Sequence, residues 1–216
     1  AMTPGFYAAI DNCLLCKTCV QYCPAKARTD HAVIAARADF AVEKGLPFSK
    51  RFVFRHVLPH RWLFGLSLRV ASAVQFLLPK GQGKFRHLPQ FLTALGAGRA
   101  VPEIAPKFLR SMLPERMSPG GRPLYRVGFF SGCATEFMFP GVGKMLVDIL
   151  RGLNCEVVFP AAQGCCGAPV MLSGDFETAK GMAMRNVRAF EDCDYVVTGC
   201  ATCGSGLREY PVYLAD

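Results

Sequence analysis

The chain has 216 residues, enough for one domain of ordinary size and a smaller one, and 51% of them are hydrophobic, which supplies a core. The formal net charge of +9 is uneven, because residues 1–126 hold 19 Lys and Arg against 6 Asp and Glu, while residues 127–216 hold 6 against 10. The 11 cysteines are odd in number, and several are so close in sequence that a disulfide between them would be strained. These features exclude a secreted disulfide scaffold and favour a reducing cytoplasm, since no signal-peptide pattern opens the sequence.

The first cysteine run is Cys13-x2-Cys16-x2-Cys19-x3-Cys23-Pro24. It matches the bacterial ferredoxin run, in which three closely spaced thiolates hold one [4Fe–4S] cubane and the fourth belongs to another cluster. Zinc and inert buried cysteines fit less well, because the third close cysteine and the Cys-Pro ending are unusual for zinc sites. We therefore predict a [4Fe–4S] cluster at Cys13, Cys16 and Cys19. Cys23 serves a second cluster or, if the chain is complete, closes the first.

We expect a helix over residues 29–44 that begins near a Thr or Asp cap. A second helical region covers residues 48–78 and is interrupted at Pro59. Its later part, residues 62–78, is at the lower length limit for a membrane span and has Arg69 near its middle, where a charge is costly in lipid. We predict a buried or surface-lying helix instead.

The basic residues concentrate between Glu43 and Glu103, where ten Lys and Arg occur without one acidic residue. Such a stretch attracts an anionic partner. Nucleic acid is disfavoured, because no zinc finger, RNA-binding signature or interleaved aromatic and basic stacking pattern accompanies the charge. We expect either anionic lipid on the cytoplasmic face of a membrane or an acidic protein subunit.

The amino-acid composition of the sequence changes near Tyr125. Residues 79–123 are rich in Pro, Gly and basic residues and indicate an extended connection with short helices. Strands are then expected over residues 125–131, 155–159 and 195–198, and helices over about 137–152 and 175–191, which predicts a βαβαβ unit with parallel strands. The predicted fold is α+β, with a small helical ferredoxin-like segment (1–46), a basic helical linker (47–123) and an α/β domain with a parallel sheet (124–216).

The remaining cysteine pattern follows the ends of these strands. Cys133 comes after the first strand, Cys165 and Cys166 after the second, and Cys200 and Cys203 after the third. Because the carboxyl ends of parallel strands meet at one edge of a sheet, where ligands bind, we expect these thiols to form one site. Adjacent thiols can face one site only if the backbone turns sharply, which Gly164 and Gly167 permit.

The pattern Gly132-Cys133, Cys165-Cys166-Gly167 and Cys200-Ala201-Thr202-Cys203 resembles the cysteine-rich CCG domain of heterodisulfide reductase subunits and of glycolate and lactate oxidase iron–sulfur subunits. The order of ferredoxin run, basic linker and CCG domain is most similar to the glycolate oxidase iron–sulfur subunit and its lactate-utilisation relatives. That family carries two ferredoxin runs and two CCG motifs, whereas this chain has one of each. We therefore expect a fragment, truncated at both ends.

The resemblance implies a second iron–sulfur cluster at the five CCG cysteines, which in the heterodisulfide reductase branch is non-cubane. A conventional cubane and a zinc site that uses four of the thiols stay open as alternatives. Cys155 and Cys193 stand outside both patterns and are expected to act as small buried hydrophobes. The four histidines, His31, His56, His60 and His87, lack the setting of a metal pair and are expected at the surface.

Two functions follow from the resemblance. The first is an electron-transfer subunit: a flavoprotein dehydrogenase subunit oxidises glycolate, lactate or a similar 2-hydroxy acid, and the clusters pass electrons to quinone or another carrier, with no catalytic residue in this chain. The absence of a dinucleotide fingerprint, a nucleophile elbow or paired carboxylates supports it. The second is a heterodisulfide or disulfide reductase with a catalytic CCG cluster. The basic linker favours the first, and a zinc-stapled interaction module leaves the ferredoxin run unexplained.

Overall fold

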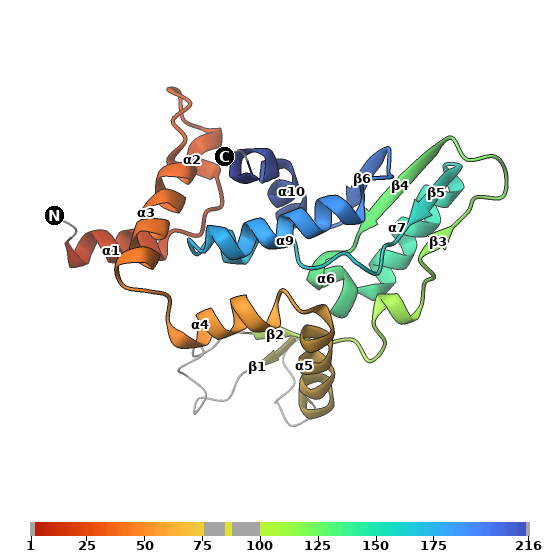
Figure 1. The fold of residues 1–216 in the computed structure, drawn as a ribbon, viewed down its shortest axis with the longest axis horizontal. Coiled ribbons are helices and arrows are strands. Elements are labelled where there is room, and N and C mark those ends of the chain that lie inside the picture. The colour runs from red at the N-terminus through yellow and green to blue at the C-terminus, as the bar shows by residue number, and fades with distance from the viewer. Residues whose placement is uncertain (1–2, 76–84, 88–99, 215–216) are drawn as a thin grey trace.

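The computed structural model describes residues 3–75, 85–87 and 100–214 and has an α+β fold, as predicted (Figure 1). The N-terminal half contains α1 (Pro4–Asn12), α2 (Thr18–Gln21), α3 (Thr29–Glu43), α4 (Phe48–Phe52), the π-helical turn η1 (Val53–Val57), α5 (Arg61–Val74), β1 (Phe85–His87) and β2 (Ala100–Pro102). The C-terminal half contains η4 (Leu109–Ser111), β3 (Arg116–Met117), β4 (Tyr125–Phe130), α6 (Gly132–Phe137), α7 (Pro140–Gly152), β5 (Cys155–Val158), α8 (Ala168–Met171), α9 (Phe176–Ala189), β6 (Tyr195–Thr198) and α10 (Ala201–Leu214).

The main sheet has the strand order β3-β5-β4-β6. The central strand β4 pairs in parallel with both neighbours, so that Val127 lies opposite Val157 on β5 and Tyr195 on β6. This confirms the predicted βαβαβ unit. The short strand β3 was not predicted; it pairs antiparallel with β5 and makes the sheet mixed. Strands β1 and β2, also unpredicted, form a separate antiparallel pair within the expected linker.

The sheet separates two hydrophobic clusters. Successive side chains on a strand point to opposite faces, and the adjacent residues Phe129 and Phe130 are both fully buried, one in each cluster. Phe129 packs with Val147 of α7, whereas Phe130 lies in the cluster that contains Val170 of α8 and Met182 of α9. The sheet is therefore covered on both faces, and its strand ends are the exposed route to any site.

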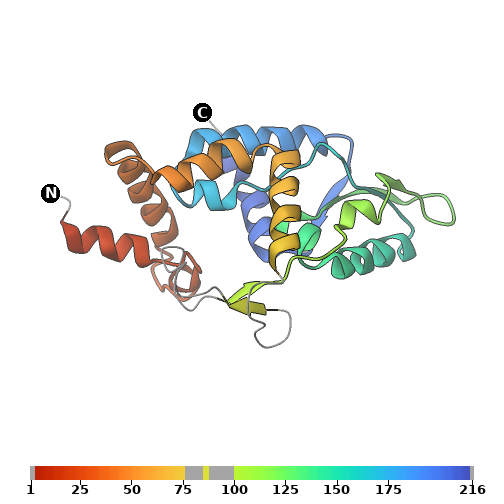
Figure 2. The same ribbon diagram turned by 90° about the horizontal axis from the view of Figure 1, so that it is seen from below.

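The linker forms the predicted helical region, interrupted at Pro59 between η1 and α5. Helix α5, drawn in gold, stands between the N-terminal segment and the sheet (Figure 2). Phe64 packs against the buried cluster around Phe137, while Trp62, on another side of the helix, is 68% exposed. No helix within the described residues is both long and apolar enough to cross a membrane. Residues 76–84 and 88–99 lie outside the described residues, and they include the end of the predicted helical region and part of the predicted extended connection.

Helix α3 holds the first cysteine run against the sheet-containing half through Arg37. The guanidinium donates hydrogen bonds to the carbonyl oxygens of Cys13, at 2.6 Å, and of Leu172, at 2.9 Å. Gly174 approaches the same helix so closely that an added Cβ would lie 2.6 Å from the carbonyl oxygen of Arg37, and its φ of +90° also favours glycine. Backbone contact at this point requires glycine, which fixes how the two halves meet.

A second contact joins the cysteine run to helix α10. Lys17, which lies between Cys16 and Thr18, donates to the hydroxyl of Ser205 at 3.0 Å and forms an ion pair with Glu209. Ser205 is two positions after Cys203 on the same helix. Figure 1 shows α2 beside the end of α10. The two cysteine regions therefore share one side of the molecule.

Candidate functional site

The five cysteines of the second pattern lie together at the carboxyl edge of the sheet. Cys133 is in α6 directly after β4, Cys165 and Cys166 precede α8, and Cys200 and Cys203 lie at the start of α10. The thiol of Cys165 hydrogen-bonds to Cys133 and Cys166, and the thiol of Cys203 hydrogen-bonds to Cys166 and Cys200. The structure thus brings together every thiol that was expected in this site, in one continuous network that joins three strand ends.

Two glycines make this close approach possible. Gly132 has a φ of +63°, and an added Cβ would lie 2.7 Å from the sulfur of Cys203. Gly167 has a φ of +78°, which supplies the sharp turn expected after Cys166. Gly164 was expected to supply similar freedom, but it has no positive φ; its N–H instead donates to Asn186. The backbone therefore turns at Gly167, after the cysteine pair, and is held by the Asn186 side chain at Gly164, before the pair.

Asn186 of α9 stabilises the turn at the cysteine pair through hydrogen bonds. No sequence motif indicates this residue. Its side-chain oxygen accepts from Gly164 N–H at 2.8 Å, and its amide group donates to the Cys165 carbonyl at 2.9 Å and to the Tyr210 hydroxyl at 3.1 Å. Tyr210 of α10 donates in turn to the Cys166 carbonyl at 2.9 Å. An Asn in mid-helix is an unfavourable helix former, and that local mismatch is the signal that could have identified it.

Mutual hydrogen bonds set the acidity of the thiols. Donation from Cys165 and Cys203 lowers the pKa of Cys166 to about 3, and donation from Cys165 lowers the pKa of Cys133 to about 7. The same bonds, together with burial, raise the pKa of the two donor thiols. The network therefore holds thiolate and thiol side by side, and the thiolate is the form of cysteine that binds metals.

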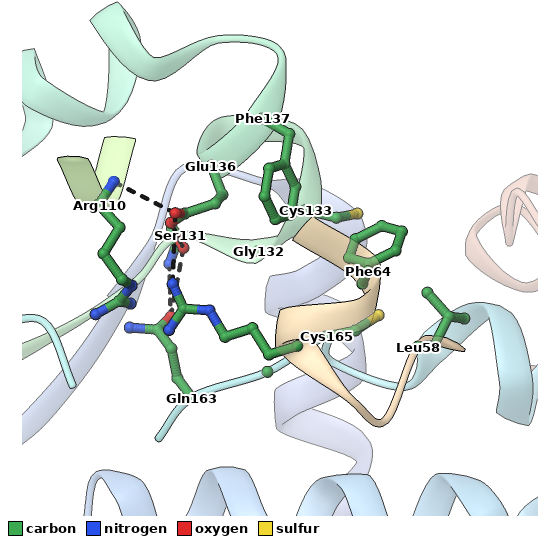
Figure 3. A pocket seen from close by; sticks show the side chains of 12 residues that line it. Leu58, Phe64, Arg110, Ser131, Gly132, Cys133, Glu136, Phe137, Gln163 and Cys165 are labelled. Atoms are coloured by element: carbon green, nitrogen blue, oxygen red, sulfur yellow. Dashed lines mark hydrogen bonds and ion pairs between the residues drawn. The ribbon is translucent and has the colours of Figure 1, made fainter. Parts of the chain in front are cut away.

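A narrow pocket of about 20 Å³ opens beside Cys133 and Cys165 (Figure 3). Leu58, Phe64 and Phe137 close its cysteine end with apolar surface. The pocket has room for about one water molecule and leaves little space for a larger one.

The opposite wall of this pocket carries a polar network around the buried carboxylate of Glu136. It accepts from the Ser131 hydroxyl at 3.2 Å and the Arg110 backbone N–H at 3.3 Å, and Arg61 lies 3.5 Å away (Figure 3). Gln163 accepts from the Ser131 N–H at 3.1 Å and ties the loop before the cysteine pair to the end of β4. Arg61 comes from the linker, so the linker completes the wall of the site.

The first cysteine run lies in loops and short helices at the surface. Cys16 and Cys19 are exposed and Cys13 and Cys23 half-buried. The Thr18 hydroxyl hydrogen-bonds to Cys16 and lowers its pKa. Thr29 was expected as a helix cap, but α3 has no side-chain cap and Thr29 lies 3.0 Å from the sulfur of Cys19 instead.

The donor set of the CCG pattern is five thiols, one more than the four ligands of a tetrahedral zinc ion. Within the part of the chain that the structure describes, no group of three or more His, Cys, Asp or Glu side chains converges on one metal-sized position. A tetrahedral zinc ion needs four sulfurs at about 2.3 Å from one point, whereas a cluster of several irons takes ligands along its extended surface. The linked row of five thiols in the CCG pattern has that extended form.

The other candidate residues follow the expectation only in part, because Cys193 is half-buried and not buried. Cys155 is buried on β5 and donates to the Leu153 carbonyl at 3.7 Å, and Cys193 packs beside Gly128. Neither takes part in the thiol network. His56 and His60 are exposed, His31 is half-buried, and the side chain of His87 lies outside the described residues.

Comparison with known proteins agrees with this geometry. The cysteine-rich CCG domain family matches residues 127–208. A Bacillus subtilis protein described as a probable glycolate oxidase iron–sulfur subunit is 31% identical over 96% of this chain and 49% of its own length. Lactate utilization protein A of Geobacillus thermodenitrificans is 43% identical over 40% of this chain and 36% of its own length. A fumarate reductase (CoM/CoB) subunit of Methanothermobacter marburgensis is 38% identical over 54% of this chain and 22% of its own length.

Residues 127–208 thus match the cysteine-rich CCG domain, and the chain is similar to the probable glycolate oxidase iron–sulfur subunit and to lactate utilization protein A. The chain spans about half the length of the first of these relatives, and less of the others. No solved structure matches it.

We expect Asn186→Ala to lower the free energy of unfolding by about 2–4 kcal/mol, because it leaves buried partners on both sides of the cysteine pair without a hydrogen bond. Tyr210→Phe removes fewer bonds and should cost about 1–2 kcal/mol. Urea denaturation measures both. Tyr195→Phe, at a residue 57% exposed, is the matched control and should change stability little. Equal effects of the two tyrosine substitutions would contradict the role of Tyr210.

Proposed function

We propose that this chain is part of an iron–sulfur electron-transfer subunit, in which clusters at the two cysteine regions carry single electrons. The observation that carries the proposal is the continuous network of five thiols contributed by three strand ends. Close-packed thiols of this kind, with the pKa of Cys166 lowered, suit all-thiolate iron–sulfur ligation.

At the CCG site the cluster ligands are Cys133, Cys165, Cys166, Cys200 and Cys203. Bound iron replaces their mutual thiol hydrogen bonds, and the cluster supplies one-electron chemistry that protein side chains lack. Five thiolates exceed the four of a cubane, which supports a non-cubane cluster here. Leu58, Phe64 and Phe137 give the Cys133 side an apolar surface, and Asn186 and Tyr210 hold the cysteine pair in place.

At the first run, Cys13, Cys16 and Cys19 hold a [4Fe–4S] cluster, and Cys23 is the fourth ligand of this or a further cluster. Arg37 and Lys17 hold the run against α8 and α10, the two helices that follow CCG cysteines in the chain. We propose three functional units: residues 1–46 with the first cluster, the linker 47–123, and the CCG domain 124–216.

The partner we propose is a flavoprotein dehydrogenase subunit that oxidises glycolate or lactate and passes electrons through this chain to quinone or another carrier. The names of the glycolate oxidase and lactate utilisation relatives support this class of reaction. The alternative is a heterodisulfide reductase, which the likeness to the fumarate reductase (CoM/CoB) subunit supports. The order of ferredoxin run, basic linker and CCG pattern favours the first function.

Anaerobically purified protein tests the ligand assignment. A variant with any one CCG cysteine replaced by Ser should contain less iron and sulfide than the unmodified protein, and the EPR spectrum of its CCG cluster should change. The Cys16→Ser variant should show changes only in the first cluster. The reason is that the hydroxyl of Ser is a poor ligand for iron–sulfur clusters.

Cys155→Ser and Cys193→Ser are the matched controls and should keep the full iron content. Zinc without iron in the unmodified protein would refute the electron-transfer proposal. Loss of iron in the two controls equal to that in the CCG variants would show that the substitutions act through folding.

The partner proposal is tested with the complete natural protein. We expect it to co-purify with a flavoprotein, and the complex should reduce a dye with glycolate or D-lactate, since the flavin removes two electrons that the clusters pass on singly. Reduction of a heterodisulfide by this protein alone, without dye reduction by the complex, would instead establish the alternative function.

We also propose that the linker lies on the cytoplasmic face of a membrane. Trp62, Leu66 and Val70 form an exposed apolar stripe along α5, because residues four apart share one face of a helix. Exposed Phe48 and Phe52 extend this apolar surface on α4. Basic residues accompany it, and the combination suits the interface of an anionic bilayer.

Co-sedimentation with vesicles checks this proposal. Binding to vesicles that contain anionic lipid should weaken as salt rises, because salt screens the attraction between exposed charges. Trp62→Ala should weaken it further, while Tyr195→Ala, on strand β6, should not. Equal binding to neutral and anionic vesicles would contradict the electrostatic part.

A further inference from the structure

The wall of the CCG pocket holds an excess of positive charge. Arg61 and Arg110 both line the pocket together with Cys133 and Cys165, and Glu136 is the buried carboxylate between them. A second carboxylate that acts on both arginines is Glu115, which is exposed, so that water screens its charge. Two guanidinium groups thus share one buried counter-charge.

The charge of Arg110 is the less compensated of the two. One nitrogen donates to the Phe159 carbonyl at 3.0 Å and the guanidinium lies 3.8 Å over the Phe159 ring, but buried Nε and Nη2 have no hydrogen-bond partner in the described structure. Burial and the neighbouring Arg61 lower the pKa of Arg110 to about 10, so the group stays protonated at neutral pH. A buried charge without a partner is strongly destabilising unless another charge of opposite sign lies nearby.

The opposite charge is available at the cysteines. Thiolate ligands give an iron–sulfur cluster a net negative charge, and one-electron reduction adds another, with no bond made or broken. A fixed positive charge that lines the same pocket stabilises the reduced form more than the oxidised form. We propose that Arg61 and Arg110 are positioning residues that raise the reduction potential of the CCG cluster. This inference rests on the cluster of the proposed function.

A redox titration with dithionite, followed by the EPR signal of the CCG cluster, tests the inference on the purified protein. At the midpoint potential of the unmodified protein, Arg110→Met should lower the ratio of reduced to oxidised cluster at least tenfold, which is 59 mV for a one-electron couple. Arg110→Lys keeps the positive charge, so its ratio of reduced to oxidised cluster should be close to that of the unmodified protein. Glu136→Gln removes the counter-charge and should raise the ratio.

Arg69→Met is the matched control. Arg69 lies 5.6 Å over the Phe108 ring in a neighbouring groove and does not line the cysteine pocket, so its loss should change the ratio less than threefold. Equal shifts for Arg110→Met and Arg110→Lys, or a lower ratio for Glu136→Gln, would overturn the inference. If the Arg110→Met variant loses its iron, two other variants test the inference. Arg61→Met should lower the ratio of reduced to oxidised cluster and Glu136→Gln should raise it, and any other result would overturn the inference. Absence of iron from the unmodified CCG site would refute the proposed function itself.

Discussion

The parallel pairing of β4 with β5 and β6 is the constraint on which the rest of the structure depends. Parallel strands bring their carboxyl ends to the same edge, and here each of the three strands is followed within a few residues by cysteine. Val127 lies opposite Val157 and Tyr195, and this register sets how far each following loop extends. A slip of the register would separate the thiols, so the sheet core and the site are stabilised together.

The sheet leaves the site open on one side, and the N-terminal half of the chain completes it. The linker supplies Arg61 and the apolar Phe64 to the pocket wall, and the helix that follows the first cysteine run meets Gly174 at backbone distance. These contacts join residues far apart in sequence, because Arg61 and Glu136 are separated by 75 residues and Arg37 and Leu172 by 135. The two halves are therefore one structural unit at the CCG site, although their sequences differ in net charge and in amino-acid composition.

Sequence patterns predicted the parts of this structure that short-range rules determine. The strand and helix order follows from local apolar runs, and the alignment of cysteines follows from strand direction alone. Strand β3 has only two residues, too few to give a periodic signal, and exists because β5 offers it an edge. The side chains that organise the site were harder to predict, because nothing near Asn186 in sequence indicates the Gly164 N–H that it satisfies. Likewise, a basic surplus is visible around Arg110, but only the fold distinguishes arginines that face solvent from those buried beside the cysteines.

The contrast between the two cysteine regions bears on how such a protein works. The first run is exposed at Cys16 and Cys19, whereas three of the five CCG thiols are buried in an apolar cluster. Exposure lets a partner approach the first site closely, while burial increases the effect of each neighbouring charge on the second. An order of electron flow can therefore be built from one ligand type, because the surroundings, and not the thiolates themselves, differ between the two sites. The half-buried Arg61 and Arg110, which line one pocket with Cys133 and Cys165, are such a difference in the described structure.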